Sequence, residues 1–119
     1  MMKTKVLNIG AKALDEKDGL IILFGKSASP RLAEVSVIQE VLDGQLQADN
    51  LSVGKKILID EQSYEIKYAG ELVFSNLETV EHTVFDFNEV PENPRSNAIY
   101  LAPNVMPQVK EGSTITFGA

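Results

Sequence analysis

LSVGKKILIDEQSYEIKYAG, residues 51–70, contains one short, mainly apolar run and one run in which apolar and polar residues alternate. The runs cover residues 56–59 and 64–68, and the polar residues 60–63 separate them. Alternation with a period of two places the apolar side chains of residues 64–68 on one face of a strand. Two such runs joined by a short polar segment predict an antiparallel β-hairpin.

Similar strand signals recur on both sides of this hairpin. They cover residues 5–9, 20–24, 83–87, 98–101 and 114–117, and Val35, Val37 and Val41 indicate one more strand. Short strands at regular spacing favour an all-β fold, either a small closed barrel or a sandwich. We therefore expect one domain, residues 1–119, with seven to eight short strands and one or two short helical turns.

Helical signals occur in two places. One turn is expected to begin at Pro30, and another near residues 75–81. In the second, Ser75 would cap the N-terminus and Glu78 would complete a capping box.

A local pattern occurs twice, as LSVGKKILI in residues 51–59 and as VKEGSTITF in residues 109–117. In each copy a glycine turn, at Gly54 or Gly112, leads into a strand whose apolar residues share one face. The match covers few residues, so we interpret it as a common way to enter a strand and not as an internal duplication.

The composition narrows the chemistry that the chain can perform. It has no cysteine and one histidine, His82, which excludes disulfides, Cys–His nucleophile pairs and zinc sites built from those residues. We expect no metal and no cofactor, and any reaction that needs an imidazole must use His82. Gly25-Lys26-Ser27 matches the end of a phosphate-binding P-loop, but the glycine required five positions earlier is replaced by Leu20.

Charge and hydropathy indicate which kinds of partner the chain is suited to bind. The chain has 11 Lys and Arg residues against 17 Asp and Glu residues, a net charge of -6, which argues against a nucleic-acid partner. Its longest apolar run, residues 20–24, is far shorter than the ~20 residues that span a bilayer. We therefore expect a cytoplasmic protein that does not insert into a membrane, and exposed strand edges would allow a homodimer.

Three stretches in a fixed order carry a family resemblance. They are residues 51–70, LETVEHTVFDF in residues 77–87, and the ending from Tyr100 to Phe117 with its EGSTITF. Together with the Pro-x-Leu-x-Glu element that begins at Pro30, they resemble the glucitol/sorbitol-specific IIA component of the phosphoenolpyruvate-dependent sugar phosphotransferase system.

The resemblance implies a small all-β phosphocarrier in sugar transport. Such a protein takes a phosphoryl group from the general carrier HPr onto a histidine, and passes it to the IIB component of a membrane permease (IIB/IIC). Histidine suits this relay because a ring nitrogen is nucleophilic near neutral pH.

The sequence departs from the family at the phosphoryl-accepting position. Counted from Leu32, this position is Gln39; counted back from Gly44, it drifts toward Val41, and neither residue is a histidine. An amide nitrogen is not nucleophilic, although the Gln39 side chain could hydrogen-bond a phosphate or a partner. His82 matches a second histidine that family members often carry, and it is the only residue left that could accept the phosphoryl group.

Two functions therefore remain open. The chain is either a phosphocarrier that uses His82, and so a phosphotransferase component, or a non-catalytic binding or regulatory module on the same fold. An unrelated small β-barrel interaction domain is a third reading, in which the resemblance reflects only the shared pattern of barrel strands.

Overall fold

The computed structural model describes residues 1–14 and 17–119, which form a closed barrel of eight strands. This confirms the predicted all-β fold and decides between the two expected architectures in favour of the barrel. The strands are β1 Met2–Ile9, β2 Leu20–Phe24, β3 Val37–Gly44, β4 Lys56–Ile59, β5 Gln62–Ala69, β6 Thr83–Asp86, β7 Ala98–Ala102 and β8 Thr114–Phe117. The helices are α1 Pro30–Glu34, the 3-10 turn η1 Ala48–Leu51 and α2 Val73–Val80.

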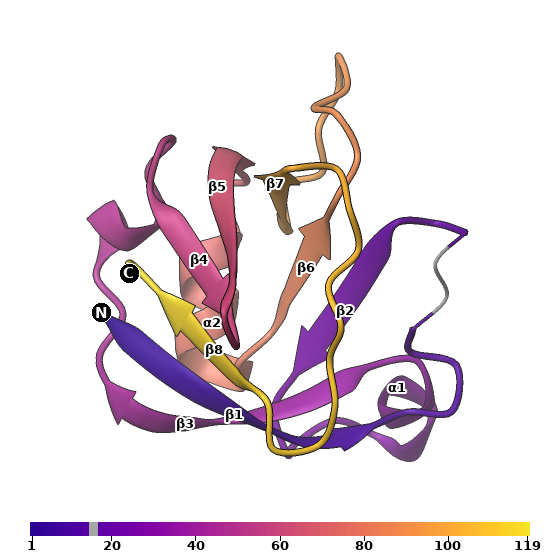
Figure 1. Ribbon diagram of the computed structural model, residues 1–119. Helices are drawn as coiled ribbons and strands as arrows, with labels where there is room; N and C mark the ends of the chain where they lie inside the picture. The colour runs from indigo at the N-terminus through magenta and orange to yellow at the C-terminus, as the bar shows by residue number, and fades with distance from the viewer. Residues whose placement is uncertain (15–16) are drawn as a thin grey trace.

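The strand order around the barrel is β1-β3-β2-β6-β7-β5-β4-β8, and β8 pairs with β1 to close it (Figure 1). Six of the eight pairings are antiparallel, whereas β2 with β3 and β6 with β7 are parallel. The pairing of Met2 with Phe117 brings the two chain ends together. Each strand of the closed barrel has two neighbours, but some contacts are short, and β2 pairs with β3 only through Val37 and Ile38. Parts of strand edges therefore stay unpaired, and the homodimer remains a prediction.

The predicted hairpin is confirmed as β4 and β5, with Asp60 and Glu61 between the strands. Asp60 has a positive φ of 53°, and its carboxylate accepts hydrogen bonds from the Thr114 backbone N–H and the Ser113 hydroxyl. The hairpin turn is therefore fastened to the start of β8.

The repeated glycine pattern leads into two neighbouring strands, β4 and β8, which pair antiparallel. Gly54 and Gly112 have positive φ values of 93° and 91°, a region that glycine enters without steric cost. The two copies thus start adjacent strands through the same kind of turn.

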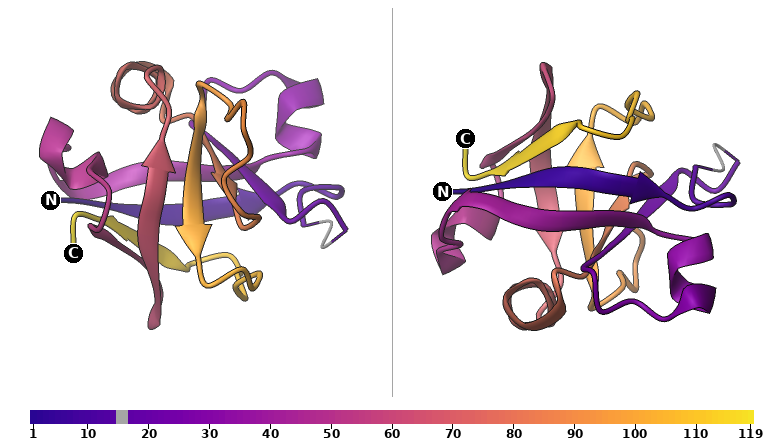
Figure 2. Two further views of the ribbon diagram at one scale, coloured as in Figure 1. Left: turned by 90° about the horizontal axis from the view of Figure 1, so that it is seen from above. Right: turned by 90° about the horizontal axis from the view of Figure 1, so that it is seen from below.

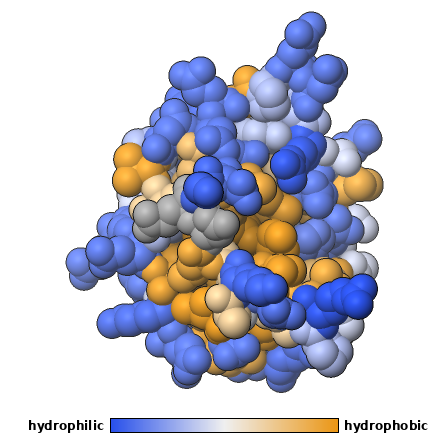
Figure 3. All heavy atoms as spheres, turned by 90° about the vertical axis from the view of Figure 1, so that its right-hand side faces the viewer, coloured by the Kyte–Doolittle hydropathy of each residue, from blue (hydrophilic) through white to orange (hydrophobic). Residues whose placement is uncertain are grey.

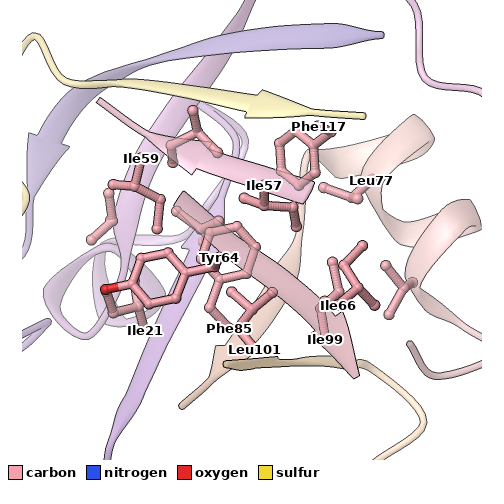
Figure 4. Close-up of a cluster of buried hydrophobic side chains, with 14 of the residues drawn as sticks. Ile21, Ile57, Ile59, Tyr64, Ile66, Leu77, Phe85, Ile99, Leu101 and Phe117 are labelled. Atoms are coloured by element: carbon pink, nitrogen blue, oxygen red, sulfur yellow. The ribbon is translucent and has the colours of Figure 1, made fainter. Parts of the chain in front are cut away.

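Alternating residues of the strands point into the barrel and form an apolar core (Figure 4). The completely or almost completely buried side chains include Ile21, Ile57, Ile59, Ile66, Leu77, Phe85, Ile99, Leu101 and Phe117. The same alternation brings three polar side chains into the interior, those of Thr4, Gln39 and Thr83, each 0% exposed. Burying a polar group destabilises the fold unless the group is hydrogen-bonded. The effect of these three side chains on stability therefore depends on their hydrogen bonds.

Both predicted helical segments are present. The start of the first is confirmed, whereas the predicted start of the second is wrong. Helix α1 begins at Pro30, and the Ser29 hydroxyl accepts a hydrogen bond from the Leu32 N–H. Helix α2 begins at Val73, two residues before the predicted cap Ser75, and has no side-chain cap. Burial of Val73 and Leu77 against the barrel explains the earlier start, because this packing outweighs a local capping signal.

Helix α2 lies outside the barrel, where Figure 2 shows it nearly end-on beside the strands. Its C-terminus leads directly into β6. There the carbonyl of Val80 accepts a hydrogen bond from Gly25, the residue after β2, and the carbonyl of Glu81 accepts one from Gln39 of β3. Within the described part of the chain, neither α-helix has the length and apolar character that crossing a membrane requires.

Candidate functional site

His82 lies at the junction between α2 and β6, with its ring against the neighbouring strand β2. Its Nδ1 is 2.9 Å from the carbonyl oxygen of Leu23, and its ring centroid is 4.9 Å from that of Phe24. The side chain is half-buried. A backbone carbonyl only accepts hydrogen bonds, so this contact places the proton on Nδ1 and leaves the lone pair of a neutral ring on Nε2.

The end of α2 holds the backbone that carries His82. Glu81 adopts the left-handed conformation, with φ 51° and ψ 36°, and its N–H donates to the carbonyl of Leu77 at 3.2 Å. The His82 N–H donates to the carbonyl of Asn76, also at 3.2 Å. This is a helix C-terminus closed by an αL residue, here without the glycine that usually occupies that place.

Gly25 allows β2 to approach this helix end closely. Its N–H donates to the carbonyl of Val80 at 2.8 Å. A Cβ at position 25 would lie 2.8 Å from the same carbonyl oxygen and would also collide with the carboxylate of Glu81. The glycine of the rejected P-loop match is therefore explained by backbone packing, not by phosphate binding.

Gln39, one of the two residues expected at the family's acceptor position, lies inside the barrel and is 0% exposed. Its Oε1 accepts a hydrogen bond from the Thr4 hydroxyl at 2.6 Å, and its Nε2 donates to the carbonyl of Glu81 at 3.0 Å. The amide is thus bonded at both ends to other parts of this chain. The expected contact of Gln39 with a phosphate or partner remains a prediction.

The alternative position, Val41, has a different environment. It is 46% exposed and lines a shallow groove with the end of α2, where Glu78 and Glu81 lie. Neither position has a nucleophilic side chain, so within the described residues His82 holds the only imidazole of the site.

Gln39 and His82, which the sequence analysis singled out separately, therefore meet through one residue, Glu81. Phe24 and Glu81 were not expected from the sequence. Phe24 shares the outward face of β2 with Ile22, so strand alternation could have revealed it. Glu81 gives no such signal, because its left-handed conformation is unusual for a residue other than glycine.

Charged groups near the ends of β2 and β3 are paired on the surface. Lys26 Nζ lies 3.3 Å from the carboxylate of Glu40, and both side chains are exposed. Among residues 1–14 and 17–119, no group of three His, Asp or Glu side chains is placed to hold a metal ion. The chemistry that this site offers is that of one imidazole whose Nε2 has no hydrogen-bond partner among the described residues.

Comparison with solved structures shows which class of protein this barrel resembles. It is similar to the crystal structure of a phosphotransferase system IIA component from Enterococcus faecalis V583, with a TM-score of 0.87 and 28% sequence identity. The match covers 99% of this chain and 100% of the other. A comparison with curated proteins found no match.

A family comparison is more specific. The model of the phosphotransferase system glucitol/sorbitol-specific IIA component matches residues 1–116. The chain therefore belongs to the glucitol/sorbitol-specific IIA family, which confirms the resemblance found in the sequence.

Proposed function

We propose that this protein works in the cytoplasm as a IIA component of sugar uptake, and that it carries the phosphoryl group on Nε2 of His82. The observation that carries the proposal is the 2.9 Å contact between His82 Nδ1 and the Leu23 carbonyl. It fixes the tautomer in which Nε2 has the lone pair, as a phosphoryl acceptor requires.

The transfer needs no proton movement at this site. The Nε2 lone pair of His82 would form a bond to the phosphorus of a phosphohistidine on HPr, while the phosphorus–nitrogen bond of the donor breaks and its electron pair returns to the donor ring. The phosphorylated ring of His82 keeps its Nδ1 proton and gains positive charge. The Leu23 carbonyl then stabilises that charge, because hydrogen bonds from charged donors are stronger than neutral ones.

The surface beside the imidazole suits contact with partner proteins. The outward side chains of β2, namely Leu20, Ile22 and Phe24, are partly exposed, and Phe24 packs against His82. Figure 3 shows apolar side chains gathered on the side of the barrel where β2 lies, with hydrophilic ones around them. Donor and acceptor proteins in such a relay, HPr and a IIB/IIC permease, would need an apolar area of this kind next to the ring.

A second candidate function is a docking or regulatory module that binds the same partners without carrying phosphate. The burial of Gln39, expected at the acceptor position when the chain is counted from Leu32, favours it, because its amide is bonded to Thr4 and Glu81. The two candidates differ in one measurable property, the covalent modification of His82.

The test incubates the protein with phosphoenolpyruvate, enzyme I and HPr, and measures its intact mass. We expect an acid-labile gain of one phosphate that is absent from His82→Ala. A family member with a histidine at the position of Gln39 serves as positive control. If the control is labelled and the wild type is not, the carrier proposal fails, and a titration with HPr then tests the docking module.

A further inference from the structure

The peptide unit between Glu81 and His82 is held at both of its polar ends. Its carbonyl oxygen, on Glu81, accepts the hydrogen bond from Gln39 Nε2 at 3.0 Å. Its N–H, on His82, donates to the carbonyl of Asn76 at 3.2 Å. Because a peptide unit is planar, two fixed ends define the orientation of the whole unit and of the Cα of His82.

Gln39 is itself held in one orientation. The Thr4 hydroxyl donates to its Oε1 at 2.6 Å, so the amide oxygen points toward β1 and the amide nitrogen toward Glu81. A reversed amide would place its N–H group against the Thr4 hydroxyl and its oxygen against the Glu81 carbonyl, leaving two oxygens facing each other. With Gln39 0% exposed, no water could compensate for that loss.

The backbone that Gln39 supports is intrinsically unfavourable. Glu81 adopts the left-handed conformation, with φ 51°, which is sterically unfavourable for a residue with a side chain. Such a conformation persists only where its surroundings enforce it, and the hydrogen bond from Gln39 acts on the carbonyl of this residue.

We propose that Gln39 is a positioning residue for His82, a role that rests on the function proposed above. Gln39 holds the Glu81–His82 peptide unit so that the imidazole places Nδ1 on the Leu23 carbonyl and leaves Nε2 free for the phosphoryl group. In this chain the side chain at the family's acceptor position supports the remaining histidine.

The first test measures the tautomer of the imidazole by long-range ¹H–¹⁵N NMR at a pH where the ring is neutral. A single histidine gives a single set of ring signals, so no assignment is needed. We expect the Nδ1–H form to dominate in the wild type. In Gln39→Met, which keeps the length of the side chain and removes both hydrogen bonds, that dominance is lost and the signals move toward those of a blocked histidine peptide.

Tyr64→Phe is the matched control. It also removes one hydrogen bond from a buried side chain to a backbone carbonyl, that of Val105, but on another strand of the barrel. We expect it to leave the tautomer unchanged. A folded Gln39→Met whose ring keeps the Nδ1–H form would overturn the proposal.

If Gln39→Met does not fold, Gln39→Glu replaces it. The introduced side chain keeps the acceptor for Thr4 and, once ionised, lacks the donor to Glu81. The same loss of the Nδ1–H form is expected at a pH where the introduced carboxyl group is ionised, and an unchanged tautomer would again contradict the proposal.

The second test separates this proposal from the proposed function. The rate of phosphorylation of His82 is expected to fall roughly 10- to 100-fold in Gln39→Met, the range seen when groups that orient reacting residues are removed, and to stay unchanged in Tyr64→Phe. An unchanged rate in Gln39→Met overturns the positioning role. If no variant, including the wild type, takes up phosphate, the carrier function fails, and the tautomer measurement alone decides the role of Gln39.

Discussion

The hydroxyl of Thr4 donates a 2.6 Å hydrogen bond to the side-chain oxygen of Gln39 inside the barrel. Both side chains are 0% exposed, and they connect β1 with β3 in an interior that is otherwise mainly apolar. This hydrogen bond offsets the free-energy cost of burying the two polar groups, and loss of either partner would restore that cost for the other. The third polar side chain of the interior, Thr83, has a hydroxyl without a hydrogen-bond partner among the described residues.

Thr4→Val should therefore destabilise the protein. The substitution preserves the shape of the side chain but leaves Oε1 of Gln39 buried without its donor, which costs about 1–3 kcal/mol in the free energy of unfolding. Urea or guanidinium unfolding at equilibrium measures this change.

Thr83→Val is the matched control, because it removes a buried hydroxyl that has no partner. We expect the free energy of unfolding to rise by about 1 kcal/mol. Equal effects of the two substitutions would contradict the assignment of the hydrogen bond to Thr4.

A side chain at position 25 should disturb the junction that carries His82. In Gly25→Ala the new Cβ meets the carbonyl of Val80 and the carboxylate of Glu81, and we expect a loss of about 1–3 kcal/mol of stability from this overpacking. The double variant Gly25→Ala with Glu81→Ala should recover part of that loss. If the two substitutions are strictly additive in unfolding experiments, the contact between positions 25 and 81 is not the cause.

Alkaline unfolding should report on the phenol of Tyr64. Burial raises the pKa of Tyr64 above its ordinary value, and its hydroxyl donates to the carbonyl of Val105 at 2.7 Å. The unfolded state therefore ionises first, near pH ~10, so the contribution of Tyr64 is complete below this pH and is lost as the pH rises through the folded-state pKa.

Tyr64→Phe tests this relation. At neutral pH we expect the variant to be less stable by about 0.5–1.5 kcal/mol through the lost hydrogen bond. Above pH ~10 the difference from the wild type should shrink, because only the wild type loses the contribution of this phenol. A difference that stays constant in urea unfolding up to pH ~11 would argue against the raised pKa.

The sequence predicted those parts of the fold that depend on local signals. Two strand-like runs around a polar segment identified the β4–β5 hairpin, and the glycines at 54 and 112 occupy the positive-φ turns that their pattern indicated. The parallel pairings of β2 with β3 and of β6 with β7 were not predicted, because they join segments whose contact depends on closure of the whole barrel.

Two residues of the candidate site, His82 and Gln39, were expected from the sequence, but the connection between them was not. His82 followed from composition and Gln39 from the family pattern. The link between them is a hydrogen bond to a backbone carbonyl 42 residues away, and backbone acceptors leave no trace in a sequence. The start of α2 was missed for a related reason, since burial of Val73 decides it and Ser75 does not.

The left-handed residue before His82 gives the last prediction. Glu81→Gly should stabilise the protein by about 0.5–1 kcal/mol, because glycine adopts φ near 51° without steric cost and this gain exceeds the entropy that it adds to the unfolded chain. Glu78→Gly, three residues earlier in the last turn of α2, should have the opposite effect and cost up to about 1 kcal/mol, since glycine is a poor helix former. Thermal and urea unfolding of the two variants would show opposite signs. A loss of stability in both would mean that the side chain of Glu81 holds the junction through its own contacts, and that relief of backbone strain is the smaller effect.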